Sequence, residues 1–290
     1  MLAVAGIDPV NTIVSRYFLT VFNPIEWVLA RAVFISIILG VWIFSTGRSF
    51  KSRCIDHQFL RAVIGFAAML LWYYAITRDS MGTTTALRYS SSLFLGIGAI
   101  ISAYNKKKNL PFISLFFIVL CFLGSVLIVF DGKLLDSGDA FNLLPNFCAL
   151  FCGFCSAQAI LQIKHMRKWK EPVWRTSLYF CVFSAIFVLL LQIFCRDMIE
   201  PDHFKKVLWD NGRTAFCMFA LVGVLGTVKH LCFTESFSAR NQLLAAVLQY
   251  LAIVFASFLG MAVYHETFLP SEIAGIAFIF IASVGMSLKK

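Results

Sequence analysis

Two basic residues, Arg88 and Lys229, stand inside stretches of the chain that are otherwise apolar. A charged side chain within a membrane span is costly, so it usually faces a cavity or a charged partner rather than lipid. Arginine and lysine also bind carboxylates and phosphates well. We therefore predict that Arg88 and Lys229 face a central cavity and hold an anionic group of a substrate. The alternative is a structural ion pair, or a side chain that extends to the membrane surface.

Aromatic and amide side chains occur in the same apolar stretches. Aromatic rings stack on flat ligands and attract cations, and amides hydrogen-bond to polar edges. The further candidates for the cavity are Trp72, Tyr73, Tyr89, Tyr250, Gln249, Gln158 and Asn11. Packing, or a position in the aromatic belt at the membrane surface, is the alternative for Trp72 and Tyr73.

Two other charged residues receive a plainer interpretation. Arg31 lies near the start of its span, where extension to the membrane surface explains it better than a cavity does. Asp8, next to Pro9, reads as an interruption of a weak first span. We therefore identify no carboxylate deep within a span.

The sequence carries no signature of an enzyme. It lacks the G-x-S-x-G, H-E-x-x-H and Walker motifs that mark serine hydrolases, zinc proteases and nucleotide hydrolases. Cys148, Cys152 and Cys155 share one helix face, but no His or carboxylate stands beside them, and buried cysteines pack as small apolar residues. We expect no metal, no other cofactor and no catalytic residue.

These candidates need apolar helices to position them, and the composition provides such helices. The chain has 290 residues, of which 60% are hydrophobic and 14% charged, and its mean hydropathy is +0.82. A spanning helix needs about 20 mostly apolar residues. We predict an all-α integral membrane protein with ten transmembrane helices near residues 2–22, 26–46, 59–77, 82–104, 111–130, 142–163, 174–195, 213–235, 240–263 and 269–288.

The chain has a net charge of +10. The distribution of its basic residues along the chain predicts an orientation in the membrane and not a nucleic-acid partner. Most basic residues lie in segments that face one side, including Arg48, Lys51, Arg53 and Arg61, Lys106–Lys108, and the stretch 164–175. Positive charge accumulates on the cytoplasmic side of membrane proteins. We therefore predict that both termini are cytoplasmic and that the acidic loop 131–141 is outside. The first span lacks the basic start and cleavage site of a signal peptide; a polar, shortened first helix or a start site further upstream accounts for it.

The two halves of the chain resemble each other. "AYNKKKNLPF" at 103–112 and "VYHETFLPSE" at 263–272 share a tyrosine, a short polar turn, Leu-Pro and an apolar run, and "ALRYS" at 86–90 precedes "AVLQY" at 246–250 by 160 residues. Five spans in each half force the second half to run the opposite way through the membrane. We predict two inverted five-helix repeats, residues 1–130 and 142–290. Glu266 then either ends a helix at the surface or acts as a gate.

The arrangement of motifs resembles a known transporter family. Arg16 precedes Pro24, and Lys164 precedes Pro172, by eight residues, and "YHETFLPSEIAGIAFIFIASVGM" closes the chain. This pattern is similar to the EamA branch of the drug/metabolite transporter superfamily, although "NKKKN" lacks a match to Glu266. More finely, "NTIVSRYF" and "WYYAIT…TTTAL" resemble bacterial transporters of S-adenosylmethionine and S-adenosylhomocysteine.

The resemblance implies a multi-pass secondary transporter of the bacterial inner membrane that works by alternating access. Its expected partners are the lipid bilayer and a small-molecule substrate, with S-adenosylmethionine taken up in exchange for S-adenosylhomocysteine. The alternatives are an exporter of amino acids, other metabolites or drugs in the same family, a membrane enzyme, and a structural or receptor-like membrane protein. The sequence leaves the oligomeric state open, a monomer included.

Overall fold

A computed structural model describes residues 1–19, 23–78, 87–105, 107, 112–129, 143–194, 212–238, 242–264 and 270–288. All regular elements in these ranges are helices. They are α1 (Leu2–Leu19), α2 (Pro24–Ser45), α3 (Ile55–Ile76), α5 (Ser91–Asn105), α6 (Phe112–Val129), α8 (Leu143–Lys168), α9 (Val173–Phe194), α11 (Gly212–Ser238), α12 (Gln242–Gln249), α13 (Leu251–Tyr264) and α14 (Pro270–Leu288). The prediction of an all-α protein is confirmed.

Every predicted span overlaps one of these helices, and the ninth overlaps both α12 and α13. Within the described ranges, four helices are long and apolar enough to cross a membrane by themselves, and they are α2, α3, α8 and α9. Shorter apolar segments lie in the other helices. The count of ten spans therefore stays a prediction. His265, Glu266, Arg240 and the loop 131–141 lie outside the described residues.

Local sequence signals set the start of α2. Pro24 occupies the first turn, where its missing N–H costs no hydrogen bond. The Asn23 side chain accepts a hydrogen bond from the backbone N of Ile25, and Glu26 Oε2 accepts one from the backbone N of Asn23 at 3.1 Å. This reciprocal cap satisfies donors that a helix start otherwise leaves free.

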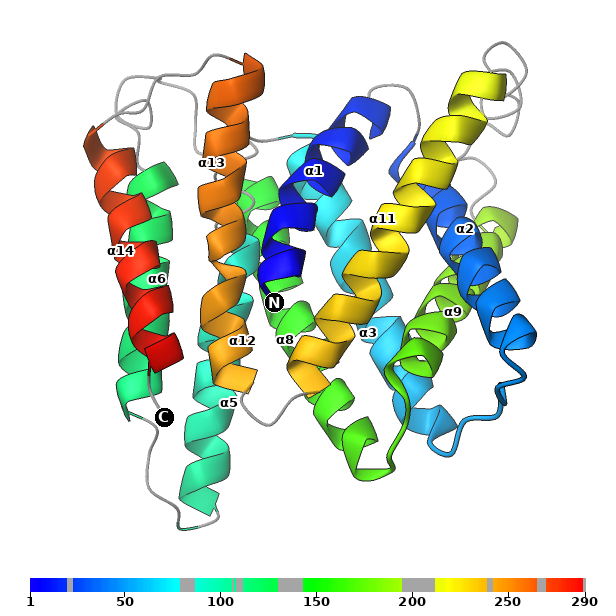
Figure 1. Ribbon diagram of the computed structural model, residues 1–290, viewed down its shortest axis with the longest axis horizontal. Coiled ribbons are helices and arrows are strands. Elements are labelled where there is room, and N and C mark those ends of the chain that lie inside the picture. Colours follow the sequence, from blue (N-terminus) through cyan, green and yellow to red (C-terminus); the bar gives the residue numbers. More distant parts are fainter. Residues whose placement is uncertain are drawn as a thin grey trace.

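Two helical stretches are interrupted at one residue each, Ser90 and Tyr250, and the backbone hydrogen bonds around the two residues follow the same pattern. The N–H of Ser90 donates to Leu87 O at 3.1 Å, and the N–H of Leu93 donates to Ser90 O at 2.9 Å. The N–H of Tyr250 donates to Val247 O at 3.1 Å, and the N–H of Ile253 donates to Tyr250 O at 2.9 Å. Bonds between residues three apart tighten a helix locally. The second interruption separates α12 from α13 in Figure 1.

The helices form one bundle with the same kind of pair at each end (Figure 1). α6 packs on α14 at one end, and α2 packs on α9 at the other. Between them α3 packs on α8 and α9, while α11 packs on α1 and α2. The middle of the bundle therefore brings α1, α3, α8 and α11 together around a shared interior.

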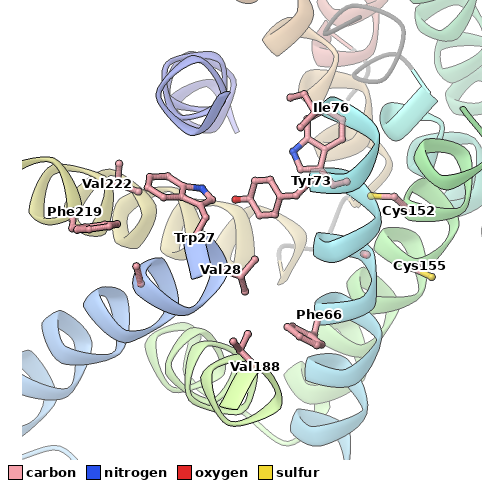
Figure 2. Close-up of a cluster of buried hydrophobic side chains, with 13 residues drawn as sticks. Trp27, Val28, Phe66, Tyr73, Ile76, Cys152, Cys155, Val188, Phe219 and Val222 are labelled. Atoms are coloured by element: carbon pink, nitrogen blue, oxygen red, sulfur yellow. The ribbon is translucent and has the colours of Figure 1, made fainter. Parts of the chain in front are cut away.

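A hydrophobic cluster fills the side of this interior next to α2 and α9 (Figure 2). Trp27 and Val28 of α2 meet Phe66 and Tyr73 of α3 there, and Val188 of α9 lies below them. The cluster also includes Cys152 and Cys155 of α8, with only 2% and 8% of their surfaces exposed. The prediction that these two cysteines pack as apolar residues is confirmed.

Candidate functional site: a cation-lined cavity

A cavity of about 160 Å³ lies between α1, α2, α3, α8, α9 and α11. Apolar residues of several helices contribute to its wall, among them Met69 of α3, Ile160 of α8 and Phe180 of α9. Four cationic side chains also line it. The polar lining residues are Asn11, Thr12, Ser15, Arg31, Arg61, Trp72, Tyr73, Arg88, Ser156, Lys229 and His230.

Asp8 of α1 lies at the centre of the charged residues. One carboxylate oxygen is 3.2 Å from Arg88 Nη2, and the other pairs with Lys229 Nζ. The Tyr89 hydroxyl donates to the same oxygen as Arg88 at 2.7 Å. Only 4% of Asp8 is exposed. The interpretation that no carboxylate lies deep within a span is therefore wrong, because Asp8 is buried and forms two ion pairs.

Arg88 combines this ion pair with two ring contacts. Its guanidinium carbon lies 4.5 Å from the centre of the Trp72 ring and 5.4 Å from that of Tyr89. A guanidinium over an aromatic face is attracted to the ring electrons. One ring face of Trp72 is therefore already covered by a protein cation.

Arg31 is inside the bundle, so the expectation that it extends to the membrane surface is wrong. It is 8% exposed and lines the cavity. Nη1 donates to the Tyr73 hydroxyl at 3.0 Å, and Nη2 lies 3.2 Å from His230 Nε2. Since a guanidinium only donates, His230 Nε2 accepts this bond and the ring is neutral.

Arg61 is also inside, and its assignment to a cytoplasmic surface segment is wrong. It is 4% exposed and lines the cavity from α3. Nη1 donates to the backbone oxygen of Thr176 at 3.0 Å, and Nη2 donates to Thr234 Oγ1 at 3.4 Å. Its guanidinium carbon is 5.0 Å from the Phe180 ring centre. Neutral groups of α9 and α11 thus hold this cation.

The predicted site residues separate into two groups. Asn11, Trp72, Tyr73, Arg88 and Lys229 line the cavity. The second group lies outside the cavity lining and comprises Tyr89, Gln249, Tyr250 and Gln158. Tyr89 and Tyr250 pack together with ring centres 5.9 Å apart in a core cluster with α6 and α14, and Gln249 is buried beside them.

The sequence reasoning missed Asp8, Arg31, Arg61 and His230. Arg31 and Arg61 carried a usable signal, since each is a charge inside a predicted span. His230 directly follows Lys229, so any cavity that receives Lys229 is close to it as well. Asp8 had the weakest signal because an Asp before Pro is common at turns.

A second polar cluster ties two loops together at one end of the bundle. Glu171, between α8 and α9, accepts from the Ser52 hydroxyl at 2.7 Å, from the backbone N of Arg53, and from Arg175 Nη1 at 2.9 Å. Burial alone would raise the pKa of Glu171, but these hydrogen bonds and the Arg175 charge hold it below the ordinary value. The ionised carboxylate therefore fastens the α2–α3 loop to the start of α9.

A bundle of apolar helices around a buried, charged cavity defines the class of multi-pass membrane transporters. The chain belongs to the EamA-like transporter family, which it matches over residues 2–130 and 143–288. The recognition made from the sequence motifs is therefore confirmed, and the protein is a membrane transporter of small metabolites.

Relatives of known name agree with this class. The pseudopaline exporter CntI of Pseudomonas aeruginosa is 20% identical over 91% of this chain and 86% of its own length. An uncharacterized transporter of Helicobacter pylori is 22% identical over 92% of this chain and 86% of its own length. Human solute carrier family 35 member G1 is 22% identical over 80% of this chain and 62% of its own length.

The fold also matches a solved structure. A protein crystal structure superposes with a TM-score of 0.72 and covers 99% of this chain and 96% of the other chain, at 14% identity. At this identity the match concerns the fold alone. The family match and the named relatives indicate transport rather than catalysis.

Proposed function

We propose that the protein is a secondary transporter that moves a small metabolite with an anionic group through the central cavity by alternating access. The observation that carries the proposal is the charge of the cavity. Arg31, Arg61, Arg88 and Lys229 line it, and only Asp8 balances them within ion-pair distance in the described part of the chain. Buried cations of this kind recognise carboxylates and phosphates.

Alternating access requires two parts that rock against each other, and the predicted inverted repeats would provide them. Two features support residues 1–130 and 142–290 as the repeats. The interruptions at Ser90 and Tyr250 have equivalent backbone hydrogen bonds and are 160 residues apart. The packing of α3 on α8 and α9 is also mirrored by that of α11 on α1 and α2. A structure whose halves superpose without inversion would overturn this part of the proposal.

The specific substrate pair that we propose from the sequence resemblance is S-adenosylmethionine taken up in exchange for S-adenosylhomocysteine. Their shared carboxylate suits Arg31 or Arg61, and the Trp72 and Tyr73 rings on the cavity wall suit the adenine. The cavity of about 160 Å³ is smaller than the roughly 300–1,000 Å³ of pockets for drug-sized ligands. An adenosyl substrate would therefore need a wider state of the transporter.

Counterflow tests the substrate pair. Proteoliposomes preloaded with unlabelled S-adenosylhomocysteine should accumulate labelled S-adenosylmethionine faster than protein-free liposomes. Accumulation at the protein-free rate would rule out the adenosyl pair as substrates. The proposal of a transporter for an anionic metabolite would then be tested with other anions.

Export is the second candidate, because a relative that matches most of this chain is named as an exporter. We propose efflux of an anionic metabolite in that case. Inside-out vesicles separate the two directions: an exporter accumulates the labelled substrate in inside-out vesicles under a proton or substrate gradient, and an importer accumulates it in right-side-out vesicles.

We also propose that the protein lies in the bacterial inner membrane with both termini in the cytoplasm. The basic segments around Arg48, Lys51 and Arg53 support this orientation, since positive charge collects on the cytoplasmic side. An epitope tag after Lys290 should resist protease added to intact cells. Cleavage of the tag in intact cells would contradict a cytoplasmic C-terminus.

A further inference from the structure

The cations of the cavity differ in whether a carboxylate already balances them. Arg88 and Lys229 share Asp8. Arg31 and Arg61 have no carboxylate within ion-pair distance among the described residues. The four lining cations, together with the one negative charge of Asp8 behind Arg88 and Lys229, therefore sum to a charge of +3.

The partners of Arg31 and Arg61 are neutral and incomplete. A guanidinium has five N–H donors. Arg31 donates to Tyr73 and His230, and its Nε is buried without a hydrogen-bond partner. Arg61 donates to one backbone oxygen and, more weakly, to one hydroxyl. Each side chain therefore keeps Nη N–H groups that are not used by these partners and can donate to a further ligand.

The two guanidinium groups contact different members of one pair of rings, His230 and Phe180. The Phe180 ring centre is 5.3 Å from that of His230, which contacts Arg31, and 5.0 Å from the guanidinium carbon of Arg61. The cations therefore occupy separate positions in the same cavity. A single carboxylate would pair with one and leave the other buried and unbalanced, which is unfavourable in a low-dielectric interior.

We propose that the cavity takes a small metabolite with two separate anionic groups, one bound by Arg31 and the other by Arg61, while Asp8 keeps Arg88 and Lys229. This inference rests on the proposed transport of an anionic metabolite, and its substrate class is an alternative to the adenosyl pair. The volume agrees, because a cavity of about 150 Å³ accepts a molecule as small as benzene, and this one measures about 160 Å³. The hydroxyl of Ser156 on its wall would donate a hydrogen bond to the same ligand.

Binding by the full-length protein in lipid nanodiscs tests the inference. Isothermal titration would compare the dicarboxylates from malonate to adipate with the monocarboxylates of equal carbon number. We expect at least one dicarboxylate to bind tenfold or more tightly than its monocarboxylate. Equal affinity across every pair would overturn the inference, whatever the variants show.

Variants then locate the two anionic groups. Arg31→Gln and Arg61→Gln should each reduce the affinity for the preferred dicarboxylate at least tenfold and bring it near that of the monocarboxylate. Lys51→Gln, which removes a positive charge from an exposed loop, should leave the affinity unchanged. Arg61→Lys keeps the charge if Arg61→Gln does not fold, and it should retain the preference for two carboxylates. Loss of affinity in Lys51→Gln equal to that in Arg31→Gln would indicate a general charge effect and contradict the site.

Transport distinguishes this inference from the proposed function. Uptake of an adenosyl compound without competition from any dicarboxylate would overturn the two-anion substrate and leave the transporter. If a dicarboxylate binds tightly but no dicarboxylate is taken up into proteoliposomes, the two-anion binding site is supported and its role in transport is overturned.

Discussion

Asp8 and Lys229 form a partly buried ion pair although 221 residues separate them in the chain. Asp8 belongs to α1 and Lys229 to α11, and the same carboxylate also binds Arg88 in the segment that leads into α5. One side chain of the first helix thus connects three parts of the bundle beside the cavity. A substrate anion that competed for Lys229 or Arg88 would loosen this connection.

Removal of the Asp8 charge should strongly destabilise the protein. Asp8→Asn leaves the partly buried Arg88 and Lys229 without a carboxylate, and loss of one partner of a fully buried pair costs about 3–5 kcal/mol, which sets the upper bound. The thermal unfolding midpoint in detergent should fall markedly, while Glu235→Gln, an exposed carboxylate on α11, should change it little.

The double variant Asp8→Asn/Lys229→Met checks the cause of that loss. It removes one of the two unbalanced cations, so it should recover part of the midpoint. If the double variant is less stable than Asp8→Asn alone, the ion pair is not the source of the effect.

Loss of the Tyr73 hydroxyl should affect Arg31 without removing the ring. In Tyr73→Phe the Arg31 Nη1 group loses its acceptor, and a buried donor left unsatisfied costs about 1–3 kcal/mol. The hydroxyl of Tyr179 donates to Phe50 O at the exposed end of the bundle, so Tyr179→Phe should cost less. Equal midpoints for the two variants would show that the Arg31 contact contributes little.

The α6–α14 contact depends on a glycine. A Cβ at Gly124 would lie 2.7 Å from the backbone oxygen of Gly275, and that oxygen cannot move aside as a flexible side chain would. Gly124→Ala should therefore lower the unfolding midpoint. A Cβ at Gly40 in α2 would meet nothing within 4 Å, so Gly40→Ala should stabilise the helix by about 0.5–1 kcal/mol. The two alanine variants shifting the midpoint in the same direction would contradict this packing.

The Glu171 cluster should make stability depend on acidity. Its pKa lies below the ordinary value of 4.5, so the ionised form contributes stability above pH 4.5 that is lost as the pH falls through the lower, native value. Wild type should be more stable than Glu171→Gln at pH 7, and the difference should shrink in acid. If the stability difference between wild type and Glu171→Gln stays constant from pH 7 down to strongly acidic pH, the ionisation of Glu171 is not its cause.

Much of the fold could be predicted because apolar runs of membrane length are a strong signal. Each predicted span overlaps a helix, and Arg88 and Lys229 proved to be partly buried charges that line the cavity. The cavity itself was only partly predictable. The partners of Asp8 lie 80 and 221 residues away, so no local pattern reveals their pairing.

Arg31 and Arg61 show why position along a span misleads. Both lie within two turns of a helix start, where a long side chain commonly reaches the surface. Here each side chain instead turns inward, because His230 and the Thr176 carbonyl of other helices accept its hydrogen bonds. Only the packing of α9 and α11 against α2 and α3 brings those acceptors within reach.

Uptake of labelled anions by reconstituted protein tests the central claim most directly. Proteoliposomes with wild-type protein, preloaded with the dicarboxylate that binds most tightly, should accumulate its labelled form. Lys51→Gln should behave as wild type, and Arg61→Gln should fall to the rate of protein-free liposomes. Equal uptake by Arg61→Gln and wild type, or wild-type uptake no faster than that of protein-free liposomes, would contradict transport through the cation-lined cavity.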